Sequence, residues 1–166
     1  MKTWNVAAVQ IGAGGNKSEN LSKALEAIDR TVIENKAVDL VVLPEYCNGE
    51  PTQNNVAELA ESIPGEFSEA MREKARSHQI NLVTGSFAET ATDGRAYNTT
   101  LVFDRNGEEI GRYRKTHLMD ALRFRETSFI APGNELCVCE LDVGRLGVMV
   151  CYDLRFPEIA RTLDLK

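Results

Sequence analysis

Asp39-Leu40-Val41-Val42-Leu43-Pro44-Glu45 is the stretch of sequence that decides the fold. A continuous apolar run that a proline stops is typical of a central strand covered on both faces of its sheet. Upstream, residues 4–10 form another strand-like run, and apolar side chains then recur along one face of a helix at Leu21, Ala24, Leu25, Ile28 and Val32. Strand, helix and strand in this order predict a βαβ unit with parallel strands, and therefore an α/β fold.

Turn and cap signals place the other elements. Asn16, with Glu19 three residues later, resembles a capping box at the start of the first helix. Asp93-Gly94 and Asn106-Gly107 predict two β-hairpins, because these dipeptides adopt the backbone of tight hairpin turns. The other expected segments are helices over residues 56–62, 66–78 and 158–166, strands over 80–87, 97–103, 109–113, 136–141 and 146–150, and a long connection over 115–133.

Length and composition describe a folded, mildly acidic domain. The chain has 166 residues, a net charge of −6 and 43% apolar residues, which fits one globular domain and excludes a disordered chain. The negative charge argues against binding of nucleic acid or of an anionic membrane. No apolar stretch approaches the roughly 18 residues of a membrane span, and residues 1–11 lack the pattern of a signal peptide. We therefore expect reduced cysteines, a cytoplasmic location and no membrane or nucleic-acid partner.

The cysteines and histidines do not form a metal motif. They are Cys47, Cys137, Cys139, Cys151, His78 and His117. Cys137 and Cys139 have the wrong spacing for a redox CxxC pair or for half of a zinc ribbon. The two histidines add no recognisable ligand set, so we expect neither a metal ion nor an organic cofactor.

Reactive side chains follow three apolar strands at the points where the strands end. Glu45 follows the first of them, where α/β folds place ligand crevices, and a buried carboxylate there suits general-base chemistry. The alternative is an ordinary glutamate in a solvated turn. Lys115 follows Arg112-Tyr113-Arg114. This basic run is either an edge strand protected by charge or a cluster that holds an anion or a developing oxyanion.

Cys151 lies where the third apolar strand gives way to a helix that begins at Pro157. This strand–turn–helix context resembles the nucleophile elbow of hydrolases, although the sequence lacks the GxSxG pattern. A cysteine near a helix N-terminus is favoured as the thiolate, which is the nucleophilic form. The alternative is a buried structural cysteine, the commoner role of an isolated cysteine.

Together the three segments resemble the nitrilase superfamily of carbon–nitrogen hydrolases. The matching motifs are Leu43-Pro44-Glu45, Tyr113-Arg114-Lys115-Thr116-His117-Leu118 and Cys151-Tyr152-Asp153-Leu154-Arg155-Phe156-Pro157-Glu158. Shorter matches run from Ala7-Ala8-Val9-Gln10 through Tyr97-Asn98-Thr99 to Pro132-Gly133, so the resemblance covers the chain from end to end. The cysteine motif is similar to that of the Nit and ω-amidase branch. The fold implied by this resemblance is a four-layer α-β-β-α sandwich.

The resemblance also implies a catalytic triad of Glu45, Lys115 and Cys151 that works without a metal or cofactor. Glu45 would accept the thiol proton of Cys151, which would attack an amide carbonyl and form a thioester acyl-enzyme. Lys115 and the backbone N–H of Tyr152 would stabilise the oxyanion, and Glu45 would later activate water. The second glutamate of the family falls at Glu126 and would position these groups.

Other polar residues near these motifs each have two interpretations. Tyr46 and Tyr152 would flank the substrate pocket or belong to the core. Arg155 would bind a substrate carboxylate or pair with a neighbouring acid. His117 invites a Cys–His interpretation, but Glu45 already fills the role of base, so we expect a structural histidine bonded within its loop. We expect Cys47 to pack or line the site rather than to act as a second nucleophile.

The chain is short for the family that it resembles, whose domain is built from two pseudo-equivalent halves. We therefore expect residues 1–166 to form only the N-terminal portion of the sandwich. Such a chain would be poorly active or unstable alone, or completed by another chain, because an incomplete sheet exposes edge backbone and an apolar face. The resemblance also implies a homo-oligomer, with residues 156–166 near the interface between copies.

Several functions are compatible with these residues. We expect cysteine-dependent hydrolysis of a small, ω-amidase-like amide. The same site would serve an N-carbamoyl amino acid amidohydrolase or a nitrilase with a different small-molecule substrate. Two alternatives come from other classes: a truncated or partner-completed chain that is a non-catalytic interaction module, and a thiol redox sensor built on Cys151.

Overall fold

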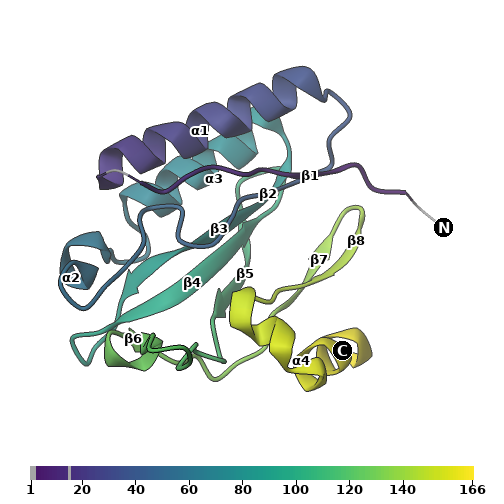
Figure 1. The fold of residues 1–166 in the computed structure, drawn as a ribbon. Helices are drawn as coiled ribbons and strands as arrows, with labels where there is room; N and C mark the ends of the chain where they lie inside the picture. The colour runs from purple at the N-terminus through teal and green to yellow at the C-terminus, as the bar shows by residue number, and fades with distance from the viewer. Residues whose placement is uncertain (1–2, 15) are drawn as a thin grey trace.

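The computed structural model describes residues 3–14 and 16–166, and a six-stranded sheet organises them (Figure 1). Five strands lie in the order β1-β2-β3-β4-β5, and β6 pairs with β4. The strands are Val6–Ala8 (β1), Leu40–Val42 (β2), Asn81–Thr90 (β3), Ala96–Phe103 (β4), Glu109–Arg114 (β5) and Ile130–Ala131 (β6). β1, β2 and β3 are parallel, whereas β4 is antiparallel to both β3 and β5. The predicted parallel pairing and both predicted hairpins are confirmed.

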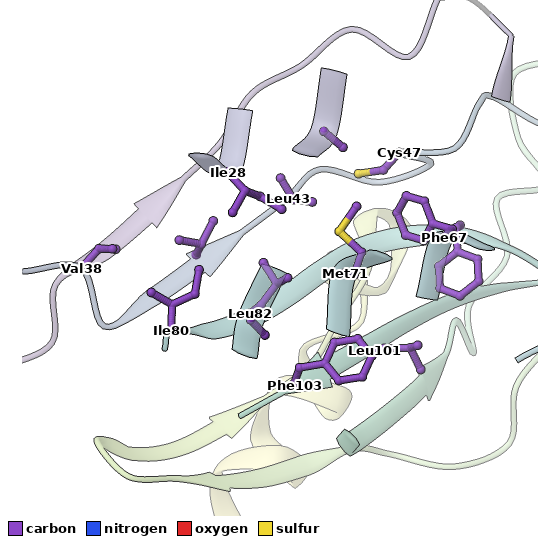
Figure 2. Packing of buried hydrophobic residues seen from close by; sticks show 14 residues of the cluster. Ile28, Val38, Leu43, Cys47, Phe67, Met71, Ile80, Leu82, Leu101 and Phe103 are labelled. Atoms are coloured by element: carbon purple, nitrogen blue, oxygen red, sulfur yellow. The ribbon is translucent and has the colours of Figure 1, made fainter. Parts of the chain in front are cut away.

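Two helices cover one face of this sheet. α1 (Lys17–Glu34) packs beside α3 (Glu66–His78), and the short α2 (Val56–Leu59) lies near the end of β3 (Figure 1). The predicted cap of α1 is confirmed, since Asn16 Oδ1 accepts the backbone N–H of Glu19 at 2.9 Å. Ile28 of α1 and Phe67 and Met71 of α3 pack onto the sheet, as Figure 2 shows. This core fixes the strand ends that carry the first reactive residues.

A hairpin and a helix cover the opposite face. β7 (Val138–Leu141) and β8 (Gly144–Gly147) pair antiparallel, and α4 (Pro157–Leu165) packs against them. The core between sheet and hairpin contains Leu40, Val83, Val102, Tyr113, Cys137, Cys139, Ile159 and Leu163. Helices, sheet, hairpin and helix follow one another in the order that the α-β-β-α resemblance implies. Along the chain that the structure describes, no helix combines the length and the apolar character needed to cross a membrane.

The structure corrects the strand predicted over residues 146–150. β8 ends at Gly147, which pairs with Val138, the first residue of β7. The backbone N–H of Val148 still donates to the carbonyl of Cys137 at 3.0 Å. Residues 148–150 then continue toward Cys151 outside the ladders that the described residues form, because β7 has no earlier residue to pair with them. The long connection over 115–133 also contains structure that was not predicted, namely β6 and the 3₁₀ turn η1 (Glu126–Ser128).

Candidate active site

Glu45 lies in a loop that follows β2 and rests directly against β3. Gly85 permits this approach, because its φ is +65° and a Cβ there would lie 2.0 Å from the carbonyl oxygen of Pro44. Ser86 then fixes the loop: its Oγ accepts the backbone N–H of Tyr46 at 3.0 Å, and its own N–H donates to Pro44 at 3.2 Å. The carboxylate of Glu45 therefore stands at the carboxyl end of a buried strand.

Lys115 is a buried cation held between two carboxylates. It directly follows β5 and is 2% exposed. Its Nζ donates to Glu45 Oε1 at 3.0 Å and to both oxygens of Glu126 at 3.1 and 3.0 Å. Burial acts to lower the pKa of Lys115, but the two carboxylates outweigh it and hold the pKa above its ordinary value. The ammonium group therefore stays charged at the centre of the cluster.

Glu126 begins η1 within the long connection, and the structure places it beside Lys115. It is 1% exposed and also accepts the hydroxyl of Tyr46 at 2.7 Å and the backbone N–H of Met119 at 2.7 Å. Burial and the neighbouring Glu126 raise the pKa of Tyr46, so its phenol stays protonated and donates. These contacts immobilise Glu126 as a hydrogen-bond acceptor.

Asn98, for which no role was predicted, contacts both carboxylates of the cluster. This residue of β4 is fully buried, and its Nδ2 donates to Glu45 Oε1 at 2.8 Å and to Glu126 Oε1 at 3.4 Å. An amide inside a buried strand was the available signal, because such a group needs polar partners. Asn98 holds the two carboxylates in place and supplies donors without adding charge.

Cys151 begins the 3₁₀ turn η2 (Cys151–Arg155) and is the exposed member of the cluster. It opens onto a cleft of about 420 Å³ whose lining also includes Glu45, Lys115 and Glu126. The rest of the lining is Ile11, Ala13, Tyr46, Glu50, Met119 and Phe124. Three sequence motifs, separated along the chain, thus meet at one cleft.

The protonation state of Cys151 differs from the sequence-based expectation. Partial burial and the nearby carboxylate of Glu45 raise the pKa of Cys151, so the thiol is protonated at neutral pH. The expectation of a helix-favoured thiolate is therefore wrong. Cys151 begins a short 3₁₀ turn with a φ of +47° and faces carboxylates. A thiolate at this position requires a proton acceptor, and Glu45 is the neighbouring carboxylate that faces it.

The two arginines before Lys115 do not join the cleft. Arg112 pairs with Glu109, Nε to Oε1 at 2.8 Å, and Arg114 binds both oxygens of Glu89 at 2.8 and 2.6 Å. The interpretation of this run as a joint anion site is therefore wrong for Arg112 and Arg114. Alternation along a strand sends neighbouring side chains to opposite faces, which separates Lys115 from Arg114.

Of the three residues predicted to bind substrate, the structure brings only Tyr46 into the cleft lining. Tyr152 is half-buried and packs edge-on against Phe156, with ring centroids 5.6 Å apart. Arg155 is exposed and, like Tyr152, is not among the described residues that line the cleft. Their assignments as substrate ligands stay predictions.

Two residues expected to be structural do pack against the site. Cys47 is buried, and its thiol donates to the carbonyl of Pro44 at 2.7 Å. His117 Nδ1 lies 2.8 Å from Asp153 Oδ1, so its bond reaches η2 rather than staying within its own loop as predicted. Within residues 3–14 and 16–166, His, Cys, Asp and Glu side chains do not gather into a group of three that could hold a metal.

Comparison with known proteins identifies relatives over the whole chain. A profile of the family described as carbon-nitrogen hydrolase matches residues 5–166. The chain is 34% identical over 171 residues to the omega-amidase NIT2 of Xenopus tropicalis, covering 100% of this chain and 61% of that protein. It is 37% identical over 176 residues to the deaminated glutathione amidase of Dictyostelium discoideum, covering 98% of this chain and 60% of that protein.

The fold agrees with a solved structure of the same superfamily. The crystal structure of Saccharomyces cerevisiae Nit3, a member of branch 10 of the nitrilase superfamily, superposes with a TM-score of 0.85 at 31% identity. The superposition covers 96% of this chain and 59% of Nit3. The chain spans 50% to 61% of the length of the curated relatives named nitrilase homolog 2, omega-amidase NIT2 and deaminated glutathione amidase. That residues 1–166 form the N-terminal portion of a longer domain stays a prediction.

Proposed function

Because the chain belongs to the carbon–nitrogen hydrolase family, we propose that it hydrolyses the carbon–nitrogen bond of a small amide with Cys151 as nucleophile. One observation carries this proposal. An exposed thiol shares a cleft with a buried ammonium that two carboxylates hold. This arrangement offers a nucleophile, a proton acceptor and a positive charge to a single carbonyl group.

The first half of the reaction forms a thioester. Glu45 takes the proton of the Cys151 thiol as the sulfur attacks the amide carbonyl carbon, and the carbonyl oxygen becomes an oxyanion. The ammonium of Lys115 stabilises this oxyanion, assisted by the backbone N–H of Tyr152. Glu45 then gives its proton to the leaving nitrogen, the carbon–nitrogen bond breaks, and ammonia or an amine departs.

The second half releases the acid. Glu45, again a carboxylate, removes a proton from water as the water oxygen attacks the thioester carbon. The carbon–sulfur bond breaks, the carboxylic acid leaves, and the proton returns from Glu45 to the sulfur of Cys151. Glu126 does not exchange protons in this scheme. It holds Lys115 by two hydrogen bonds and keeps its ammonium aimed at the cleft.

The cleft suits a small substrate with a short apolar stem. Its volume is about 420 Å³, and Ile11, Met119 and Phe124 supply apolar lining. The named activities of the relatives, omega-amidase and deaminated glutathione amidase, are both amide hydrolyses. We therefore propose a small ω-amide as substrate, with N-carbamoyl amino acids and nitriles as the competing classes.

Substitution of Cys151 tests the proposal. Ammonia release from a panel of small ω-amides, N-carbamoyl amino acids and nitriles is measured for the wild type and for Cys151→Ala. We expect the wild type to release ammonia from the ω-amides and Cys151→Ala to release none. Cys137→Ala is the matched control, because Cys137 is buried in the core away from the cleft and its loss should leave turnover unchanged. Turnover retained by Cys151→Ala would contradict the assignment.

We also propose that copies of the chain associate through residues 156–166 in the cytoplasm. Leu154, which flanks this segment, and Leu165, at the end of α4, are 79% and 76% exposed, so this end of the chain presents apolar side chains that a second copy would cover. Sedimentation of the wild type and of Leu165→Glu tests this association. A monomeric wild type would contradict it.

A further inference from the structure

Asp153 is a fully buried carboxylate that the reaction described above does not use. It lies in η2, two residues after Cys151. A charged group without exposure requires several hydrogen-bond donors, because burial removes its hydration. The donors that surround Asp153 come from two separate parts of the chain, and both parts belong to the site.

One contact holds the turn that presents the nucleophile. Asp153 Oδ2 accepts the backbone N–H of Val150 at 2.9 Å, which closes the chain around Cys151. Cys151 has a φ of +47°, in the left-handed region that residues other than glycine rarely adopt. The contact across the turn therefore stabilises a backbone conformation that Cys151 disfavours by itself.

The other contacts hold the residues on either side of Lys115. The hydroxyl of Tyr113 donates to Asp153 Oδ2 at 2.6 Å, and the hydroxyl of Thr116 donates to Oδ1 at 3.3 Å. His117 binds the same Oδ1 through its backbone N–H at 3.0 Å and through its ring Nδ1 at 2.8 Å. An ionised carboxylate only accepts hydrogen bonds, so Nδ1 of His117 carries the proton.

Two further features stabilise the hydrogen bonds around Asp153. Burial and the neighbouring carboxylate of Asp153 raise the pKa of Tyr113, so its phenol remains a donor. The ring of His117, whose Nδ1 bonds to Asp153, stacks on Phe156 with centroids 3.9 Å apart. The segment of Cys151 and the segment of Lys115 are thus joined by one buried anion and its donors.

We propose that Asp153 is the positioning residue that sets the placement of the Cys151 sulfur relative to Lys115 and Glu45. Its relevance to turnover rests on the proposed function, whereas its effect on the Cys151 thiol does not. An asparagine has nearly the same shape, but it replaces one of the two accepting oxygens with an NH₂ group. That group cannot accept a hydrogen bond from the donors that surround Asp153. Asp153→Asn should therefore release the turn while leaving most of the core intact.

The test is the pH dependence of Cys151 alkylation by iodoacetamide, followed by mass spectrometry of the Cys151 peptide. In the wild type, burial and the carboxylates of Glu45 and Glu126 raise the pKa of the Cys151 thiol, and together they outweigh the opposing charge of Lys115. In Asp153→Asn the thiol moves away from all of these groups, and because their net effect is to raise its pKa, the midpoint of alkylation shifts down toward that of a free thiol. The kcat for the amide falls on the order of 10²-fold, as expected for a misplaced nucleophile, with little change in KM.

Two variants keep the test decisive. Tyr113→Phe removes one donor and should shift the alkylation midpoint in the same direction by less, which covers the case in which Asp153→Asn fails to fold. Asp39→Asn is the control: Asp39 accepts two hydrogen bonds, one from Asn5 and one from Arg105, but it precedes β2 at the end of the sheet opposite the cleft. It should lower stability without moving the midpoint.

The outcomes separate the two proposals. Folded Asp153→Asn and Tyr113→Phe variants with the wild-type alkylation midpoint would overturn the positioning role, whatever the turnover. A shifted midpoint in a chain that hydrolyses no amide would overturn the proposed function and leave the positioning role standing.

Discussion

Two ionic clusters, built around the adjacent residues Arg114 and Lys115, have opposite balances of charge. In the Lys115 cluster, one buried ammonium lies between the carboxylates of Glu45 and Glu126. In the Glu89 cluster, one buried carboxylate accepts two hydrogen bonds from Arg114 and one from Thr99, and Arg112 stands 3.9 Å away. In both clusters protein groups surround a buried ionisable side chain, Lys115 in one and Glu89 in the other.

The difference lies in what each cluster leaves available. The oxygens of Glu89 are occupied by a bidentate arginine and a hydroxyl, an arrangement that stabilises structure. The Lys115 cluster has one more carboxylate than cations, and Glu45 faces an exposed thiol with a raised pKa. Buried charge therefore does not distinguish the candidate active site. Proton-accepting capacity beside a nucleophile does.

Removal of that capacity should give the largest effect. Glu45→Gln keeps the shape of the side chain but cannot accept the thiol proton, so kcat/KM should fall by about 10²- to 10⁴-fold. Because the carboxylate of Glu45 contributes to the raised pKa of Cys151, the alkylation midpoint should move to lower pH in the same variant. Glu89→Gln is the control and should change neither quantity. Near-wild-type turnover of Glu45→Gln would break the distinction between the clusters.

The next effect in size concerns the cation. Lys115→Met removes the charge that faces the oxyanion and should reduce kcat by about 10²- to 10³-fold. It also leaves Glu126 buried without its ion pair, so the variant should be less stable by about 3 kcal/mol. Steady-state kinetics and urea unfolding measure the two losses. A loss of stability with unchanged kcat would make Lys115 a structural residue like Arg114.

Sequence reasoning found the reactive residues that follow a strand but not those that act through tertiary contacts. Glu45 and Lys115 stand directly after apolar runs, where an abrupt change of residue type is visible. Asn98 lies 53 residues from Glu45 and Asp153 lies 40 residues from Tyr113, so their partners are defined only by folding. Glu126 came from the family resemblance alone, because residues 115–133 lack a regular hydrophobic period.

The fold shows the same division. The parallel strands and the hairpins were predictable because hydrophobic period and turn dipeptides are local signals. The end of β8 was not, since a strand ends where its partner ends, and β7 begins only at Val138. Apolar residues 148–150 resemble a strand in sequence, yet they pack into the core as an extended segment that leads to Cys151.

A substitution in the Glu89 cluster should affect stability alone. Arg114→Met removes both hydrogen bonds to Glu89. Because the Arg114 side chain is 39% exposed, solvent screens this pair, and the free energy of unfolding should fall by about 1–3 kcal/mol. Turnover should stay within about 3-fold of the wild type, since Arg114 and Glu89 are not among the described residues that line the cleft and so do not contact the transition state. Urea unfolding and steady-state kinetics measure the two quantities. A large fall in kcat would show that the two clusters are coupled.

The smallest effect concerns a buried thiol beside the site. Burial raises the pKa of Cys47 to about 12. The unfolded chain loses the Cys47 proton above the ordinary thiol pKa of about 8.5, whereas the folded chain keeps it to higher pH. The contribution of this thiol to the free energy of unfolding is therefore fully present below about pH 8.5 and is lost as the pH rises toward the folded pKa. Urea unfolding of the wild type should therefore show a stability that declines over this range, and Cys47→Ala should decline less steeply. Equal slopes would place Cys47 in contact with solvent.

The most direct test of the central claim is mass spectrometry of the acyl-enzyme, with the reaction of a small ω-amide quenched by acid. The account predicts an added acyl group, as a thioester, on the peptide that contains Cys151, and its absence in Cys151→Ala. Amide hydrolysis without any adduct dependent on Cys151, or an adduct on another residue, would contradict it.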